Sequence, residues 1–339
     1  MADIRPIWKD YTVSLGNYEY RDFRIVCAPS VVYSGRAYRR PAQDTISIRI
    51  NDICADYLQN SLPQLEDAEL TPASSVATFT VEVLSGSSWS TVATVTFSND
   101  WSYDYGHDPD TDGMSFPVNG RLSPLQYLMY TTGGKNTFTA TLTYRDGNSS
   151  IVVFPINIYA DYNDDYNGDY AIQQRLADGG TGVIDLSGYD GLAAVDIEGR
   201  HYVVEEACSR YVLYYVNAYG GWDSLLCEGT PQEQDSLTRH TVKREYVNTD
   251  ASARGTENYA NEIEKTWTLR SGWMTDDAAS RMHHLLNATT VYLHDLQAGL
   301  VLPVILTGTA SDYKTYRNQG NRMFNYEVEV QLAQERTRR

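Results

Sequence analysis

The chain has 339 residues, of which 42% are hydrophobic and 21% are charged. These proportions are typical of a folded globular protein and exclude a disordered one, and the length allows two or three domains of ordinary size. The net charge is −17, and residues 71–200 contain 16 acidic but only 5 basic side chains. Nucleic-acid binding depends on clustered Lys and Arg, so we expect none here and attribute the acidic surface to solubility.

The N-terminal segment and the cysteines indicate a protein that is made and folded in a cytoplasm. Residues 1–16 are polar and lack the apolar core of a signal peptide. No stretch approaches the ~18 apolar residues of a membrane span. Neither a disulfide framework nor a zinc site is expected, because no C-x-x-C pair is present. Cys208 and Cys227 could face each other across a hairpin, but we expect free, mostly buried thiols at all four cysteines: Cys27, Cys54, Cys208 and Cys227.

Alternation of apolar and polar residues predicts a mainly β fold, which the 27 tyrosines also favour. Residues 78–86 and 90–98 predict one strand pair, and residues 136–160 predict a second pair around the turn Asp146-Gly147. Four strands at this spacing favour a β-sandwich domain over residues 71–160. The insert at residues 100–134 is expected to be a structured loop.

The remaining segments complete a predicted domain plan. Residues 1–70 are expected to form N-terminal strands or an arm that could complete a neighbouring domain. Residues 161–182 are rich in Gly and Asp and predict a linker. Residues 183–335 predict a second, β-rich domain.

One amphipathic helix is expected in this second domain, at residues 275–287. Thr275 would cap it, and two aspartates follow in the first turn, where they favour the helix dipole. Strands are predicted before and after it, and the last, Met323–Gln334, alternates cleanly. The predicted inward face of that strand is Phe324, Tyr326, Val328, Val330 and Leu332.

The stretch YVNAYGGWDSLLCEG at residues 215–229 could contain a serine nucleophile or a tight turn. Asp223-Ser224-Leu225 is one residue from a Gly-Asp-Ser-Leu lipase signature, but Trp222 occupies the glycine position. A nucleophile elbow also joins a strand to a helix, whereas both flanks here resemble strands. We therefore predict a hairpin, with positive φ at Gly220 and Gly221 and with Tyr219 and Trp222 packed across the turn.

Two acidic segments are similar in sequence to calcium-binding loops. Asp108, Asp110 and Asp112 alternate before Gly113, as in the first half of a calcium loop. The twelfth position would be Asn119 instead of the bidentate Glu of an EF-hand, and no helix flanks the segment. A solvated acidic turn and a structural Ca²⁺ site both remain open. Residues 163–169 match the calcium pattern less well.

No other cofactor or catalytic group is predicted. His283 and His284 are adjacent on the predicted helix, so their side chains diverge and cannot share one metal ion. The chain has neither a phosphate loop nor a dinucleotide-binding or zinc signature. We therefore expect a protein that is not an enzyme.

Three sequence elements carry a resemblance to a known group of proteins. They are Asp100-Trp101-Ser102-Tyr103, the segment Pro117–Gln126, and Asn217–Asp223. Together with the C-terminal stretch from Trp267 onward, they resemble virion structural proteins of tailed phages that infect Bacteroides-type gut bacteria. The resemblance implies a tail or tail-tip (baseplate) component of the virion, assembled in the bacterial cytoplasm. It also implies that the C-terminal domain is similar to the ring-forming domain of tail-tube, distal-tail and hub proteins.

This resemblance predicts contacts with copies of the chain in a closed ring and with other tail proteins. The predicted interaction residues are Trp101, Tyr103, Tyr219, Gly220, Gly221 and Trp222, which would present an amphipathic ridge to a neighbour. One alternative is a carbohydrate-binding adhesin module on the virion, with a host surface glycan bound near Trp101. Another is a head-decoration or connector protein.

Overall fold

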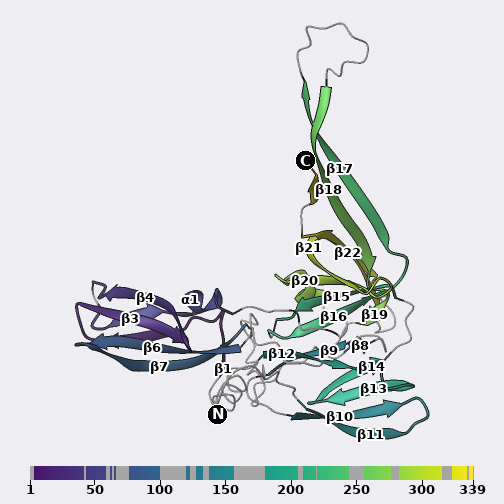
Figure 1. The fold of residues 1–339 in the computed structure, drawn as a ribbon. Helices are drawn as coiled ribbons and strands as arrows, with labels where there is room; N and C mark the ends of the chain where they lie inside the picture. The colour runs from purple at the N-terminus through teal and green to yellow at the C-terminus, as the bar shows by residue number, and fades with distance from the viewer. Residues whose placement is uncertain are drawn as a thin grey trace, which may run out of the picture. The chain divides into compact units, whose positions relative to one another are not determined.

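The computed structural model describes residues 4–41, 43–58, 62, 65, 76–99, 120–122, 127–132, 137–155, 180–204, 209–218, 220–243, 256–275, 282–314, 323–333 and 336–338. The fold is mainly β, as predicted, and its strands form several sheets (Figure 1). The chain divides into two compact units. One comprises residues 1–206 with 216–223, and the other comprises residues 207–215 with 224–339.

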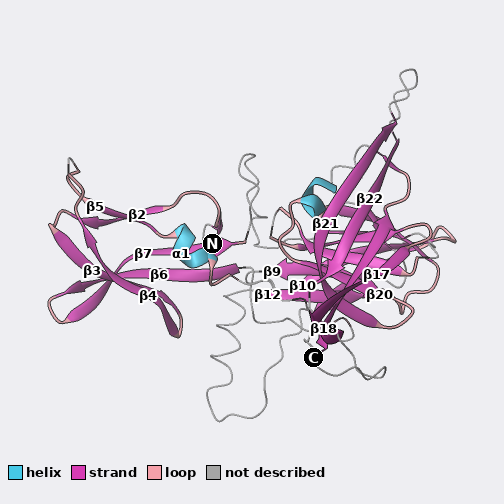
Figure 2. Ribbon diagram, turned by 90° about the horizontal axis from the view of Figure 1, so that it is seen from above, coloured by secondary structure: helices cyan, strands magenta, loops and turns pink. Residues whose placement is uncertain are grey.

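The first sheet of the N-terminal unit contains five strands. Their order is β1 (Ile4–Pro6), β7 (Ser88–Ser98), β6 (Val76–Ser85), β3 (Tyr20–Cys27) and β4 (Ser30–Tyr38). A separate pair, β2 (Thr12–Gly16) and β5 (Ile46–Arg49), and the short helix α1 (Asn51–Ala55) complete this region (Figure 2). Apolar side chains of the sheet, the strand pair and the helix share one buried core, which includes Leu15, Ile25, Ile46, Cys54, Phe79 and Phe97.

This sheet joins strands of residues 1–70 to the first predicted hairpin. Strand β3 pairs with β6, with Phe23 opposite Val83 and Ile25 opposite Val81. Residues from the predicted N-terminal arm therefore lie in the same sheet as the first predicted hairpin. Alternation in the sequence shows which face of a strand is buried, but it does not show which distant strand lies beside it.

A second sheet of this unit has its own core. Its strand order is β11 (Ser149–Pro155), β10 (Thr137–Tyr144), β13 (Leu192–Ile197), β14 (Arg200–Val204) and β8 (Gly120–Leu122). Strands β9 (Tyr127–Thr132) and β12 (Gly180–Asp185) form a further pair. The buried residues include Leu128, Phe138, Leu142, Ile184, Val195 and Tyr202.

Both predicted hairpins are present, but they do not form the predicted sandwich over residues 71–160. The β6–β7 and β10–β11 hairpins pair antiparallel as expected. They belong to different sheets with different cores, because β10 pairs with β13 from beyond the predicted linker. Residues 161–179 of that linker lie outside the described part of the chain.

The C-terminal sheet follows the order β16 (Trp222–Cys227), β15 (Tyr211–Val216), β20 (Val291–Asp295), β21 (Leu300–Lys314), β22 (Met323–Leu332), β18 (Thr256–Arg270) and β17 (Gln232–Lys243). Two short strands join it at the side: β19 (Met274–Thr275) pairs with β22, and β23 (Arg336–Arg338) pairs with β18. This order places β22 in the interior of the sheet, between β21 and β18.

The predicted faces of β22 are confirmed. The five residues of its predicted inward face are between 0% and 9% exposed and belong to the core of this sheet. Residues 282–286 are helical, and Met282 and Leu285 enter the same core. Residues 276–281 of the predicted helix lie outside the described part of the chain.

Candidate functional site

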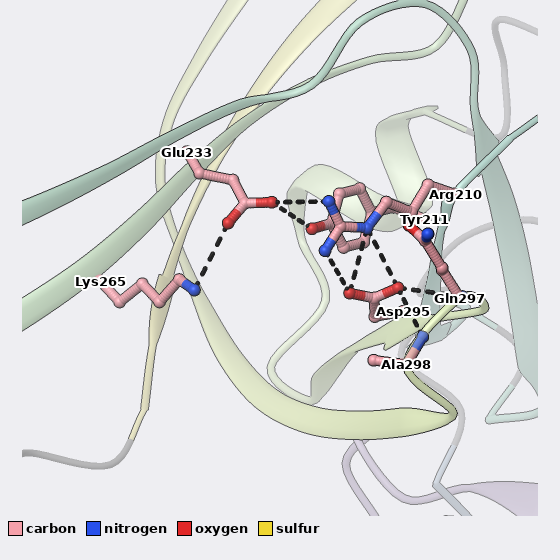
Figure 3. Close-up of polar contacts among 7 residues, drawn as sticks. All are labelled: Arg210, Tyr211, Glu233, Lys265, Asp295, Gln297 and Ala298. Carbon is pink, nitrogen blue, oxygen red and sulfur yellow. Dashed lines mark hydrogen bonds and ion pairs between the residues drawn. The ribbon is translucent and has the colours of Figure 1, made fainter.

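A polar cluster joins four strands and one turn of the C-terminal unit (Figure 3). Arg210 immediately precedes β15, Tyr211 begins it, and Glu233 and Lys265 lie in β17 and β18. Asp295 ends β20 and precedes the turn to β21. Figure 3 shows Glu233 and Asp295 on either side of the Arg210 guanidinium group, with Lys265 reaching Glu233 from the side away from Arg210.

Arg210 and the turn after β20 hold the Asp295 carboxylate. The Nε of Arg210 lies 3.2 Å from both carboxylate oxygens, and its Nη2 lies 2.8 Å from Oδ2. The backbone N–H groups of Gln297 and Ala298 donate to Oδ1 at 3.0 and 3.1 Å. The hydrogen bond from Arg210 is the main cause that holds the pKa of Asp295 below its usual value, although burial opposes it.

Glu233, at the start of β17, is held by three donors. The Tyr211 hydroxyl donates to its Oε1 at 2.5 Å, and Arg210 Nη1 lies 3.1 Å from the same oxygen. Lys265 Nζ lies 3.4 Å from Oε2. The Tyr211 hydrogen bond is the main cause that lowers the pKa of Glu233, while burial and then this bond raise the pKa of Tyr211.

These contacts require the C-terminal sheet to curl. Strands β15 and β17 are separated by β20, β21, β22 and β18 in the sheet order. A flat sheet would therefore hold β15 and β17 roughly 24 Å apart at the usual strand spacing. The direct hydrogen bond between Tyr211 and Glu233 instead places the ends of these strands within reach of each other's side chains. The sheet is therefore curled, and we call the curled sheet the barrel and the polar cluster its seam.

Strands β17 and β18 continue past this seam as a two-stranded arm, which we define as residues 235–243 and 256–265 (Figure 1). Strand β22 pairs with β18 only between Thr266 and Arg270, and β23 covers Asn261–Ile263. All of β17 is exposed except at His240, which is half-buried. The arm exposes 47% of Leu237, 41% of Val242 and 61% of Tyr259.

The seam predicts a specific dependence of stability on pH. Because the folded-state pKa values of Asp295 and Glu233 are lowered, their stabilising effect is present above the ordinary carboxyl values of 3.8 and 4.5. This effect is lost as the pH falls through the lowered folded-state values. We expect Asp295→Asn to reduce the free energy of unfolding by roughly 1–2 kcal/mol at pH 7 and by much less at pH 3. Urea unfolding of the full chain at pH 7, 5, 4 and 3 measures this difference.

The matched control for this series is Glu264→Gln, which removes an exposed carboxylate from the neighbouring arm. Its unfolding free energy should stay close to that of the unmodified chain at each pH. An equal loss of stability at pH 3 and pH 7 in Asp295→Asn would show that the charge of Asp295 does not stabilise the seam.

The structure describes only part of the predicted interaction site. Trp101, Tyr103, Tyr219 and the possible calcium ligands Asp108, Asp110 and Asp112 lie outside the described residues. The hairpin turn at residues 217–221 is present, and Asn217 closes it by accepting from Gly220 and Gly221 N–H groups. Gly220 has a φ of 76°, but Gly221 is not among the residues with positive φ.

Trp222 corrects the prediction of an exposed ridge. Its side chain is fully buried, and Gly220 and Gly221 are buried as well. An aromatic pair flanking a turn has the same sequence pattern whether the turn is covered or exposed, so burial could not be read from this stretch.

The two flanks of the segment that contains Ser224 are strands, β15 and β16, as predicted. Ser224 itself is a strand residue. It lies in β16, whose six residues are all buried, and not at an exposed strand-to-helix turn.

Among the described residues, no group of three or more His, Cys, Asp or Glu is placed to hold a metal ion. Cys54 and Cys227 are free thiols, and burial raises the pKa of each to about 12.

The seam residues were not recognised in the sequence. The segment following Asp295, Leu-Gln-Ala-Gly, has the composition of a turn in which an aspartate accepts backbone N–H bonds, and this signal was available. Arg210, Glu233 and Lys265 have no such signal, because only the curling of the sheet brings them together.

Comparison with known proteins adds little to this description. The sequence matches no protein-family model and no curated protein. One solved structure with a detectable likeness is the baseplate of the anti-feeding prophage, with 11% identity and a TM-score of 0.19. The match covers 40% of this chain and 96% of the baseplate chain. A TM-score this low does not show a shared fold. No described helix is long and apolar enough to cross a membrane.

Proposed function

We propose that this chain is a non-enzymatic structural subunit of a tailed-phage virion, in the tail or the tail-tip baseplate, where copies of it form a closed ring. The virion assignment comes from the sequence resemblance described above. The observation that supports an assembly role is the β17–β18 arm, in which every residue of β17 except His240 is exposed in the described structure.

A ribbon of this kind, which has a third strand only where β23 pairs with Asn261–Ile263, is poorly stabilised in water by itself. Three or more strands, or packing against another element, are usually needed. Among the described strands, β17 has no hydrogen-bonded partner on the side away from β18. The arm also exposes Leu237, Val242 and Tyr259. An edge that is both unpaired and partly apolar is suited to pairing with another chain.

A closed ring is the arrangement that uses such an edge without uncontrolled growth. If each arm packs on the next copy in the same way, the contact is head-to-tail, and a rotation that closes leaves no free edge. The seam at Glu233 and Lys265 would support this contact by fixing the root of the arm to the barrel. Other tail proteins would then contact the faces of the ring, in a particle assembled in the bacterial cytoplasm.

The last strand predicted from the sequence does not provide the edge for this contact. Strand β22 is paired on both sides, so it offers no edge to a neighbour. Strand β17 is the edge that the described structure leaves open.

The test is to replace the exposed apolar residues of the arm together, as Leu237→Thr, Val242→Thr and Tyr259→Thr. Threonine keeps the preference for strand structure while removing most of the apolar surface. We expect the unmodified full chain to form rings in electron micrographs and a concentration-dependent oligomer in sedimentation. The triple variant should remain monomeric with an unchanged circular dichroism spectrum.

The matched control is Val203→Thr, which changes an exposed apolar strand residue of similar accessibility, 41%, outside the arm. Its assembly should be normal. The proposal would be wrong if micrographs of labelled particles showed isolated copies that touch no other copy of the chain. Labels found on the head instead of the tail would favour a head-decoration or connector protein.

A further inference from the structure

The first sheet of the N-terminal unit has an outward face with an unusual composition. The core side of this sheet carries Phe23, Ile25, Val81 and Val83. The alternate positions point to the other side, where cross-strand pairs place Tyr20 beside Tyr38, Asp22 beside Arg36, and Arg24 beside Glu82. We call the surface formed by Tyr20, Asp22, Arg24, Arg36, Tyr38, Glu82 and Trp89 the Tyr20–Trp89 face.

At one end of this face, two tyrosine rings lie beside a fixed guanidinium–carboxylate pair. Arg36 donates to Asp22 through Nε at 2.6 Å and through Nη2 at 2.9 Å. The same guanidinium group lies 4.7 Å from the centre of the Tyr20 ring, and the Tyr20 and Tyr38 rings are 6.2 Å apart. Tyr20 is 53% exposed and Tyr38 is 66% exposed. The rings are therefore held in place while much of their surface contacts water.

The other end of the face repeats this arrangement with different residues. Arg24 Nε lies 2.5 Å from Glu82 Oε2, and the Arg24 guanidinium lies 4.6 Å from the centre of the Trp89 ring. Trp89 is 36% exposed. Each end thus combines an exposed aromatic ring, a guanidinium group and a carboxylate whose charges cancel.

The chemistry of this surface restricts what it can bind. Its two arginines are paired with its two acids, so the surface has no net charge to attract a phosphate backbone or an anionic lipid. The tyrosines are separated from Trp89 by the Asp22–Arg36 pair and by Leu84, which lies opposite Trp89, and the next row contains Ser34 and the Arg24–Glu82 pair. Beyond that pair, a last row contains Val31, Val26, Thr80 and Thr94. The centre of a protein–protein interface is instead depleted of charged residues and rich in apolar contacts.

A neutral sugar chain fits these features. The C–H groups on one face of a sugar ring pack against an aromatic ring, and its hydroxyl groups both donate to carboxylates and accept from guanidinium groups. The ion pairs keep these planar groups in fixed positions, which reduces the ordering required when a ligand binds. From Tyr20 to Arg24 the strand spans roughly 13 Å, so a ligand that contacts both ends must be an oligosaccharide.

We propose that the Tyr20–Trp89 face is a binding site for a neutral oligosaccharide of a cell-surface polysaccharide. This site is separate from the residues near Trp101 considered in the sequence. It is also independent of the arm and of ring formation, and it would give a virion component an additional ability to hold the host surface.

The test is binding of the purified full chain to an array of neutral oligosaccharides four to eight sugars long, followed by calorimetric titration with each oligosaccharide that binds. Trp89→Ala and the double variant Tyr20→Ala with Tyr38→Ala should each weaken binding by about tenfold or more. The control is Trp8→Ala, which removes a tryptophan of similar exposure, 43%, from the same region but not from this face. It should bind as the unmodified chain does.

Three outcomes would overturn the proposal. They are an array without any bound oligosaccharide, binding that Trp89→Ala and the tyrosine variant leave unchanged, and a preference for charged over neutral glycans. Recognition of a virion protein through Trp89 in place of a glycan would show that the face is a protein interface. Ring formation is measured separately by sedimentation, so a failure here does not bear on the proposed assembly role.

Discussion

Val328→Pro is expected to unfold the barrel of the C-terminal unit. Val328 is 1% exposed and lies in the interior strand β22, opposite Leu269 on one side and Thr309 on the other. Proline has no backbone N–H and a restricted φ, so it removes a ladder hydrogen bond and disturbs the pairing on both sides. A loss of about 3 kcal/mol or more in the free energy of unfolding is expected. Urea unfolding with hydrogen exchange of the β20–β22 amides measures it.

The neighbouring substitution Glu329→Gln separates the effect of the backbone from that of the side chain. Glu329 is exposed, and glutamine keeps its length and its backbone N–H. We expect a change within about 0.5 kcal/mol. A native barrel in Val328→Pro, with protected amides in β22, would show that β22 is not an interior strand.

Trp267→Ala is expected to be comparably damaging and also to loosen the arm. The Trp267 side chain is 2% exposed and packs in the barrel core at the point where β18 leaves it. Lys265 lies 5.2 Å from the centre of its ring and also contacts Glu233 of the seam. Removing the ring leaves a large cavity, which typically costs about 3–5 kcal/mol. Thermal unfolding gives the stability, and limited proteolysis within the arm reports its attachment.

Trp273→Ala provides the matched comparison, because it makes the same chemical change at a side chain that is 41% exposed. Its effect should be below about 1 kcal/mol. If both tryptophan variants lost the same stability, the placement of Trp267 in the core would be wrong. If Trp267→Ala destabilised the barrel without speeding proteolysis of the arm, the seam alone would hold the arm.

The seam, the arm and the Tyr20–Trp89 face require different kinds of information to recognise. In the sequence, the arm consists of two ordinary alternating strands. Only the pairing register shows that the pairing of β18 with β22 ends at Thr266 of β18. The seam joins residues that are up to 85 positions apart. The Tyr20–Trp89 face depends on β3 lying between β4 and β6, and the sequence did not show which strand of the neighbouring domain would pair with β3.

Several features follow from the sequence alone: the mainly β fold, the two tight hairpins, the buried face of β22 and the strand flanks of the turn at residues 217–221. Those features depend on residues within one or two strands of each other, so alternation and turn residues such as Gly147 are sufficient. Long-range packing instead sets the partners of β3 and β10, the interior position of β22, the burial of Trp222 and the contacts of Arg210 with Asp295 and Glu233. Each of these depends on which distant strands pair and how far the sheet curls. The free energy that stabilises one strand pairing over another comes from many contacts between distant residues, so no short stretch of the chain predicts the pairing.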